Sequence, residues 1–458
     1  MEENFFNRPI AEIISDLQQR NENVRLWSEL RKAYYPEQHE IVVDKQTRQD
    51  KVREDGVIDK AARIHLGLEQ LLVKRMTDFL FAIPVKRNYK YDANNERQKA
   101  IVEAIEAIYK DVRFHSLNLN RSKKVYASQE AYTHWYLVKK EHQKYGFKSD
   151  YKLKCNVYSP MDDVDIYPYF DEDDDLKAVS LYYSKTIGES TTNYFDVYTE
   201  DKHYLYVQQD AEWKVEIDGE EIEAHKIPGV YTWVKDSLYY DLQDKRSEIE
   251  YTLSRNSDVI AYNSAPVLKV VGQIIGKEKK GETQRILRVE QGGDVSYVSW
   301  QQGQDAVKAH VETMLSLYFM LSQLPDISAS KMMSLGNVGY DARMTIFMDA
   351  HLKVGEESEI WLETFDREYN IIKSFLPKLN QEFTQEDIDA VECEFEITPY
   401  MPKDAQTSLD MILKANGQKA VMSQKESIER AGYSKNAEDT LKQIREEEEI
   451  AKTESVFL

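Results

Sequence analysis

The stretch Asp241-Leu-Gln-Asp-Lys-Arg-Ser-Glu-Ile-Glu-Tyr-Thr-Leu-Ser-Arg255 opens the part of the sequence that decides the fold. Apolar residues recur around it at helical spacing, at Val234, Leu238, Leu242, Ile249 and Leu253. A second helix is predicted by the same spacing at Val307, Val311, Met314, Tyr318 and Leu321. From about Ala265 to Trp300 the residues between them favour strands. We therefore predict two long helices that bracket a small β module.

Two strands are predicted inside this β module, Pro266-Val-Leu-Lys-Val-Val271 and Arg285-Ile-Leu-Arg-Val289. Both are rich in β-branched and aliphatic residues, which suit a pleated sheet. The basic stretch Gly276-Lys-Glu-Lys-Lys-Gly281 is expected to be the loop that joins them, and Gly292-Gly293 the next turn.

The region before Tyr151 has mostly helical periodicity. The apolar positions that carry this periodicity fall into five groups: Ile10, Ile13, Ile14 and Leu17; Val24, Trp27, Leu30 and Tyr34; Ile64, Leu68, Leu71, Leu72, Met76 and Leu80; Ile101, Ile105 and Ile108; Tyr126, Ala131, Trp135 and Val138. Pro84 is expected to end the third helix, because the residue before a proline disfavours helical geometry.

From about Tyr151 the period changes to two, because Leu153, Cys155 and Val157 alternate with polar residues. Further strand-like runs surround Leu181 and cover 194–197, 204–207 and 213–217. A small antiparallel sheet is therefore predicted. Asp218-Gly219 predicts a hairpin turn, since both residues tolerate positive φ, and Pro228-Gly229 is expected to close the unit.

After Pro325 the residues 328–341 are rich in Ser, Gly and Met, which predicts a mobile loop. Helical periodicity resumes at Arg343 and continues towards Leu376, and 394–397 is predicted as a short strand. Three helices are expected after this strand. Capping-box spacing at Thr407 with Asp410 and at Ser423 with Glu426 predicts where two of these helices begin. Gly417 and Gly432 are predicted to end helices.

The composition argues against a surface that grips DNA tightly, because the 458 residues carry a formal net charge of -21. An acidic wall that repels DNA suits a conduit, although the same charge also keeps a large assembly soluble. No apolar run approaches the roughly 18 residues that cross a bilayer, and Met1-Glu2-Glu3 is unlike a signal peptide. Cys155 and Cys393 are expected to be core residues rather than a disulfide or a zinc site.

The sequence contains no catalytic motif with a specific spacing. There is no G-x-x-x-x-G-K-[ST] phosphate loop, and the nine histidines have no metal-ligand spacing. The acid cluster of Asp162, Asp163, Asp165 and 171–175 is compatible with a divalent cation or with a charged loop, and it lacks the EF-hand spacing. We therefore expect a protein that is not an enzyme and that has no cofactor and no metal.

The order of helix, β insert, helix, loop, long helix and terminal helices resembles the tailed-bacteriophage portal protein family, in particular its long-tailed, siphophage-like branch. The stretch 241–255, followed by 261–272, looks like the portal stem helix entering the clip. Phe395-Glu-Ile-Thr-Pro-Tyr-Met-Pro-Lys-Asp404, followed by Leu413-Lys-Ala-Asn-Gly417 and 423–432, looks like the exit from the wing into the crown. The resemblance covers most of the chain after about Ala61.

The resemblance implies a portal fold of the α+β class, mainly helical and ring-forming. Its parts would be a helical wing (1–150), a β-rich wing (151–232), stem helices (233–264 and 304–324), a β clip (265–303), a tunnel loop (325–341), a long tunnel or wing helix (342–392) and a helical crown (393–458). It also implies a ring, commonly a dodecamer, at one capsid vertex, with double-stranded DNA passing along its axis. The implied partners are the terminase large subunit, the head-tail adaptor, and the major capsid and scaffold proteins, with no membrane; the implied location is the virion, after assembly in the host cytoplasm.

The resemblance places the candidate DNA-channel residues in and just after the tunnel loop: Ser330, Lys331, Ser334, Gly336, Asn337, Gly339 and Arg343. Gly336 and Gly339 permit backbone changes that adapt a loop to a helical duplex. Lys331 and Arg343 are either weak phosphate contacts or ordinary surface charges. The candidate partner-binding residues of the clip are Lys277, Lys279, Lys280, Arg285 and Arg288, which either meet an acidic partner or belong to a solvated loop.

Two other classes of protein share parts of this pattern. A neck adaptor or minor capsid protein has a similar composition, but it does not need two long helices around a β module. A magnesium-dependent nuclease would use Asp162, Asp163, Asp165 and Asp173.

Overall fold

The computed structural model describes residues 5–52, 54, 56–188, 190–209, 212–263, 267–271, 274–277, 287–289, 294–298, 304–328, 340–400, 405–416, 421–434 and 436–455. The chain divides into two compact units. Unit 1 comprises Met1–Asp326 with Asp349–Tyr400, and unit 2 comprises Ile327–Met348 with Met401–Leu458. The secondary structure is α+β, as the sequence predicted.

Helices form most of unit 1 before residue 129, and most of the predicted apolar positions are their buried faces. The helices are α1 (Ile10–Leu17), α2 (Trp27–Tyr34), α3 (Glu40–Val43), α4 (Leu68–Phe81), α5 (Glu96–Asp111) and α6 (Phe114–Ser128). Asn95 caps α5 by accepting hydrogen bonds from the backbone N–H groups of Arg97 and Gln98. Short strands β1 (Lys51–Val52) and β2 (Ile58–Asp59) form a hairpin between α3 and α4.

The helix predicted through Tyr126, Ala131, Trp135 and Val138 is wrong beyond residue 128. Gln129 has φ of 64°, and the chain continues as strand β4 (Glu130–His142). Residues 130–135 are all buried, so the strand has no polar face and its period of two is hidden. β4 lies between β5 (Ser149–Tyr158) and β11 (Gly229–Trp233) in a three-stranded sheet.

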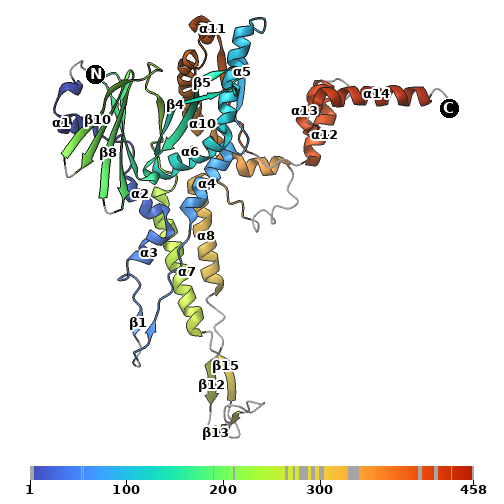
Figure 1. Cartoon of the computed structure of the whole chain (residues 1–458). Coiled ribbons are helices and arrows are strands. Elements are labelled where there is room, and N and C mark those ends of the chain that lie inside the picture. Colours follow the sequence, from blue (N-terminus) through green and yellow to red (C-terminus); the bar gives the residue numbers. More distant parts are fainter. Residues whose placement is uncertain are drawn as a thin grey trace. The chain divides into compact units, whose positions relative to one another are not determined.

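A second, five-stranded antiparallel sheet has the order β10-β9-β8-β7-β6. Its strands are β6 (Val164–Phe170), β7 (Leu176–Ile187), β8 (Ser190–Thr199), β9 (Lys202–Gln209) and β10 (Glu212–Glu221). The hairpin predicted at Asp218-Gly219 is wrong, because both residues lie inside β10 at a β-bulge, where Gly219 has φ of 70°. Helix α1 packs on this sheet through Ile13, Ile14 and Leu17 (Figure 1).

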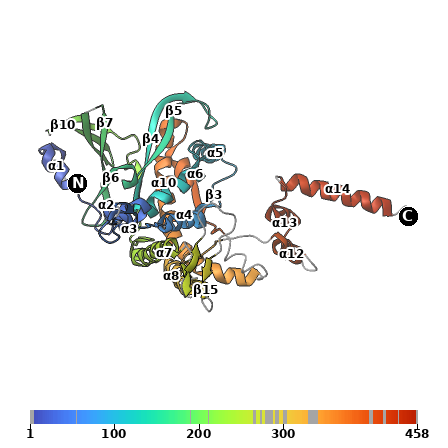
Figure 2. The same cartoon turned by 90° about the horizontal axis from the view of Figure 1, so that it is seen from below.

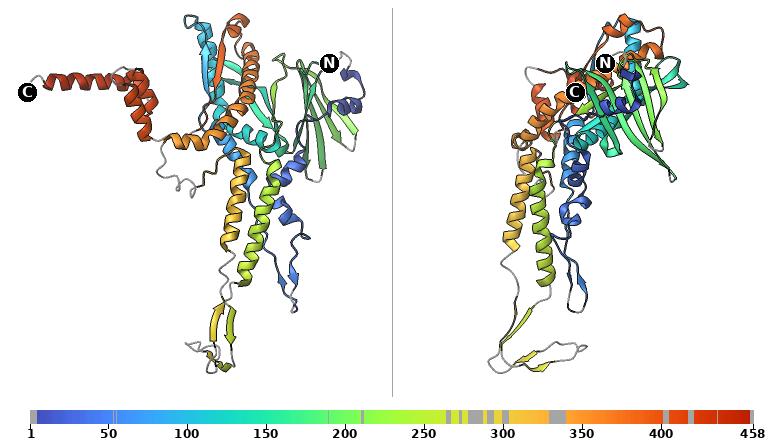
Figure 3. Two further views of the ribbon diagram at one scale, coloured as in Figure 1. Left: turned by 180° about the vertical axis from the view of Figure 1, so that it is seen from behind. Right: turned by 90° about the vertical axis from the view of Figure 1, so that its left-hand side faces the viewer.

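The two helices predicted around the β module are present and pack against each other. They are α7 (Gln243–Asn263) and α8 (Gln304–Ser322). The first begins later than the apolar pattern suggested, because 234–242 form a loop and the short helix η4 (Tyr240–Leu242). In the insert, β12 (Val267–Val271) pairs with β15 (Asp294–Val298), and β13 (Ile274–Lys277) pairs with β14 (Leu287–Val289). Figure 3 shows this module at the far end of the helix pair.

The long helix expected at 342–392 is α10, which runs from Tyr340 to Leu379 and is followed by α11 (Gln385–Ala390). The helix predicted from Arg343 towards Leu376 is therefore confirmed, and Pro377 lies in the last turn of α10. The short strand β16 (Glu392–Glu396) is confirmed and pairs with β3 (Lys86–Lys90). Cys155 on β5 and Cys393 on β16 are half-buried rather than core residues, and burial raises the pKa of each thiol to about 12.

A buried ion pair ties α10 to the rest of unit 1. The Arg121 guanidinium donates to both carboxylate oxygens of Glu368, each at 3.0 Å, and the Trp135 indole N–H donates to the same carboxylate at 3.1 Å. Arg121 is 1% and Glu368 0% exposed. Helix α6, strand β4 and helix α10 therefore meet at one charged contact inside the core.

Unit 2 contains the three predicted terminal helices, α12 (Ala405–Ala415), α13 (Gln424–Ala431) and α14 (Ala437–Ser455). The Ser423 hydroxyl accepts from the Glu426 N–H at 3.1 Å, and Gly432 ends α13 with φ of 71°, as predicted. Thr407 is not a cap, because α12 already begins at Ala405. Gly417 lies outside the described residues. None of the described helices is both long and apolar enough to span a membrane.

Candidate functional site

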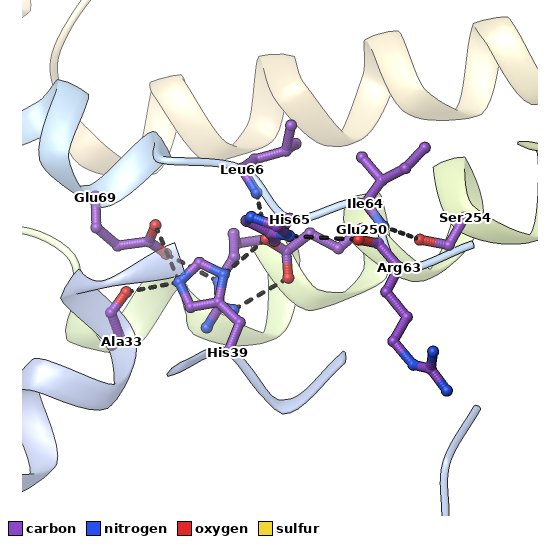
Figure 4. Close-up of polar contacts among 10 residues, drawn as sticks. Ala33, His39, Arg63, Ile64, His65, Leu66, Glu69, Glu250 and Ser254 are labelled. Atoms are coloured by element: carbon purple, nitrogen blue, oxygen red, sulfur yellow. Dashed lines mark hydrogen bonds and ion pairs between the residues drawn. The ribbon is translucent and has the colours of Figure 1, made fainter. Parts of the chain in front are cut away.

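A polar site made by three chain segments lies along α7 at the base of the α7–α8 pair. An extended segment, 61–66, runs along α7 and donates three hydrogen bonds from its backbone to side chains of that helix. Figure 4 shows the two that Ile64 and Leu66 donate. Leu66 donates to Glu250 at 2.7 Å, Ile64 to Ser254 at 2.9 Å, and Ala62 to Asp258 at 2.9 Å. These acceptors follow one another at intervals of four residues.

The regular pattern follows from the geometry of the two elements. Alternate residues of an extended chain are about 6.6 Å apart, and four residues of an α-helix rise about 6 Å. Every second backbone N–H group of the segment therefore lies beside a side-chain acceptor on a successive turn of α7. We call this set of three hydrogen bonds the 62–66 ladder.

A buried charged cluster lies at the upper end of the ladder. Arg246 donates from Nε to Glu69 at 2.9 Å and from Nη1 to Glu250 at 3.2 Å. The side chains of Arg246, Glu69 and Glu250 are 4%, 0% and 1% exposed. The cluster joins α4 to α7, and none of its charges is in contact with bulk water.

His39 completes the cluster (Figure 4). Its Nδ1 lies 2.7 Å from Glu250 Oε1, and its Nε2 lies 2.9 Å from the carbonyl oxygen of Ala33. Both imidazole nitrogens therefore lie within hydrogen-bonding distance of an oxygen atom. Burial raises the pKa of Glu69 to about 7, against the opposing effect of Arg246.

A second set of contacts holds the C-terminal end of α8 and the first residues of the predicted tunnel loop. Arg75 of α4 donates from Nη1 to the carbonyl oxygen of Pro325 at 2.8 Å and lies 3.6 Å from Asp326. Lys353 of α10 donates to the carbonyl oxygen of Ser322 at 2.9 Å, and burial lowers its pKa. Arg75 and Lys353 are functional candidates that the sequence alone did not single out, because their partners are backbone carbonyls distant in the chain.

The predicted channel residues Ser330, Lys331, Ser334, Gly336, Asn337 and Gly339 lie outside the described residues. Arg343 lies in the first turns of α10, where only the backbone is described. In the β module, Lys277 ends β13 and Arg288 lies on the paired strand β14. Lys279, Lys280 and Arg285 lie outside the described residues, so the partner-binding role of this group stays a prediction.

The acidic cluster between residues 162 and 175 is held by turns and ion pairs. Asp162 pairs with Lys124 at 2.7 Å, and Asp165 pairs with Arg20 at 2.8 Å. Asp171 accepts the backbone N–H groups of Asp173 and Asp175 at 3.1 and 2.9 Å, which is the geometry of a charged turn. Within the described part of the chain, no three His, Cys, Asp or Glu residues converge in a way that could hold a metal ion.

Comparison with known proteins adds one match that spans these elements. The family described as "Phage portal protein, SPP1 Gp6-like" matches residues 16–454, which include α7, the β module, α8 and the three terminal helices. Among solved structures, a chain in the neck of an empty GTA particle, computed with C6 symmetry, is 12% identical with a TM-score of 0.38, over 86% of this chain and 94% of that chain. No curated protein matches the sequence. Because the family match covers nearly the whole chain, this protein belongs to the SPP1 Gp6-like family of phage portal proteins.

Proposed function

We propose that copies of this chain form a closed ring at one capsid vertex, through which double-stranded DNA enters during packaging and leaves during ejection. The observation that carries the proposal is the family match from residue 16 to residue 454. A subunit of such a ring must present two different faces whose rotation closes. The proposed ring is a dodecamer.

In this proposal α7 and α8 are the stem and 325–341 is the loop that lines the channel. Arg75 and Lys353 support it, since they fix the end of α8 where the loop begins. Lys331 and Arg343 would make weak phosphate contacts as DNA passes.

The β module is the proposed clip, which docks the terminase large subunit during packaging and the head-tail adaptor afterwards. The scaffold and major capsid proteins would surround the ring in the virion. Lys277 and Arg288 lie on the paired strands β13 and β14 of this module, and an acidic partner surface is the one that basic residues would recognise.

The mass and symmetry of the purified protein test the proposal most directly. Native mass spectrometry and negative-stain class averages should give a closed ring of about twelve subunits with an axial hole. A small closed oligomer without a channel would overturn the proposal and favour an adaptor role.

A further inference from the structure

The hairpin that carries β1 and β2 is an unusual element of unit 1, because its base is firmly held while its apolar side chains face solvent. We call residues 45–63 the arm. Val52 and Ile58 form a cross-strand pair and are 72% and 58% exposed. A two-stranded ladder of this size is marginal in water without further packing.

The base of the arm is fixed on α7 by the contacts of its two ends. Arg48 forms an ion pair with Asp258, which also accepts the N–H of Ala62 at 2.9 Å. Arg63 pairs with Asp50 at 2.9 Å and donates to the carbonyl oxygen of Arg48 at 2.6 Å. These contacts direct the arm away from the body and hold it beside the helix pair, so its position is determined by the fold.

The arm and α8 lie on opposite sides of α7. Helix α7 contacts α3, which leads into the arm, and it contacts α8. The order arm, α7, α8 is visible in two views that differ by a quarter turn (Figures 1 and 3), and Figure 2 shows α3, α7 and α8 in the same order from below. One subunit therefore has an arm at one edge of the helix pair and the outer side of α8 at the other.

The outer side of α8 carries apolar residues that the subunit itself does not cover. Leu317, Met320 and Leu321 share one helical face and are 38%, 59% and 51% exposed. The opposite side of α8 packs inward, where Phe319 is 7% exposed and lies under the Arg75 guanidinium of α4. Apolar side chains are thus exposed at both edges of the pair.

The charges of the two edges are complementary. The arm carries six Lys or Arg residues against four Asp or Glu residues, in a chain whose net charge is -21. Helix α8 carries Asp305 and Glu312 against Lys308, whereas Glu250 and Asp258 of α7 are already paired within the subunit. Asp305 and Glu312 on α8 are exposed, as are Lys51 and Lys60 on the arm.

We infer that the arm of one copy packs on the outer side of α8 of the next copy, as a clasp between neighbouring subunits. This inference rests on the proposed ring. In a closed ring each subunit contacts its two neighbours through two different surfaces, and here these surfaces are the arm and the outer side of α8. The partner is a second copy of this chain, because the two edges match each other in apolar exposure and in charge.

Cysteine crosslinking tests the clasp. Val52→Cys is combined in turn with Ala306→Cys, Thr313→Cys and Leu317→Cys, three exposed positions along α8, so that no axial register is assumed. Oxidation of the assembled ring should give a series of covalent oligomers, from dimers upwards, for at least one of the three double variants. Rings assembled from a mixture of the single variants should give covalent dimers only.

The matched control places the cysteine at Ile187, which is 80% exposed at the end of β7, and it should give no such series. As a second readout, Val52→Asp with Ile58→Asp should raise the protein concentration at which half the rings dissociate by tenfold or more. Ile187→Asp should leave that concentration unchanged. Because all three side chains are exposed, the unfolding temperature of the subunit should stay the same in every variant.

The two proposals fail differently. Normal rings without any bond between the arm and α8, and with unchanged dissociation in the Asp variants, would overturn the clasp and leave the proposed function intact. A small closed wild-type oligomer without a channel would overturn the proposed function, and the clasp with it.

Discussion

At the scale of single residues, the charged cluster at the base of α7 illustrates how a buried arginine is tolerated. Arg246 lies between two carboxylates that are themselves buried, so each charge has a partner at hydrogen-bonding distance. Such a cluster contributes little net stability over an apolar replacement of the whole set. Removal of Arg246, however, takes the guanidinium away from two buried carboxylates and leaves Glu250 with the His39 ring and the Leu66 N–H as its remaining partners.

Arg246→Met should therefore lower the free energy of unfolding by about 3–5 kcal/mol, because Glu69 and Glu250 lose their cation. Urea denaturation followed by circular dichroism measures the change. Arg255→Met, at an exposed position of the same helix, is the control and should change the value by less than about 0.5 kcal/mol. If the double variant Glu69→Gln/Arg246→Met costs as much as the separate changes added together, the residues do not act as a cluster.

His134 makes stability depend on pH through a different cause. It is buried on β4, its Nδ1 has no hydrogen-bond partner among the described residues, and burial lowers its pKa to about 4. An unfolded histidine titrates near 6.5, so below that pH the unfolded chain binds a proton that the folded chain does not. The stabilising contribution is present above pH 6.5 and is lost as the pH falls towards 4.

Between pH 6.5 and pH 4.5 the free energy of unfolding should fall by roughly 2 kcal/mol less in His134→Phe than in the wild type. Thermal unfolding across this range measures it, with His65→Phe at an exposed site as the control. Equal slopes for wild type and His134→Phe would contradict the assignment. Glu69 acts in the opposite direction, because its raised pKa removes stability as the pH rises from about 4.5 to about 7.

At the scale of elements, the pairing of β11 with β4 depends on the absence of a side chain at Gly229. A Cβ atom there would lie 2.5 Å from Cζ of Tyr132 and 2.6 Å from the carbonyl oxygen of Thr133. Tyr132 is 0% exposed, so its ring has no free space into which to move.

Gly229→Ala should destabilise unit 1 by roughly 1–3 kcal/mol, since β11 must shift away from β4. Gly355→Ala is the matched control, because a Cβ at that position of α10 meets nothing within 4 Å. It should stabilise the protein by up to about 1 kcal/mol through helix propensity. Urea midpoints of the two variants should move in opposite directions, and a common direction would contradict this account.

At the scale of the whole molecule, the apolar core belongs to unit 1. Every apolar side chain that the described structure buries lies between Ile13 and Val391, and all of them except Phe347 belong to unit 1. Among the described residues after residue 400, which belong to unit 2, Ser427 is the only one that is buried. The cooperative unfolding of the chain should therefore report on unit 1.

A chain ended after Tyr400 should unfold within about 3 °C of the full-length protein, because the truncation removes little buried apolar surface. Differential scanning calorimetry measures the transition. A truncated chain that no longer unfolds cooperatively would mean that residues 401–458 complete the core of unit 1.

The order of elements could be predicted from the sequence because it is encoded locally. Apolar residues at helical spacing marked α1, α4, α5 and α8, and the Ser423 cap and Gly432 marked the two ends of α13. Periodicity and capping depend on neighbours within a few residues, which one sequence displays directly. The order of these elements, compared with known families, was enough to indicate the portal family.

The tertiary structure alone decided the features that depend on contacts distant in the chain. Strand β4 was mistaken for a helix because burial on both faces erased its alternation, and Gly219 serves a bulge because β10 continues past it. The 62–66 ladder joins residues about 190 positions apart, and Arg246 reaches Glu69 across 177 positions. No local pattern specifies such pairs, since they arise only when packing brings α4, α7 and the arm together.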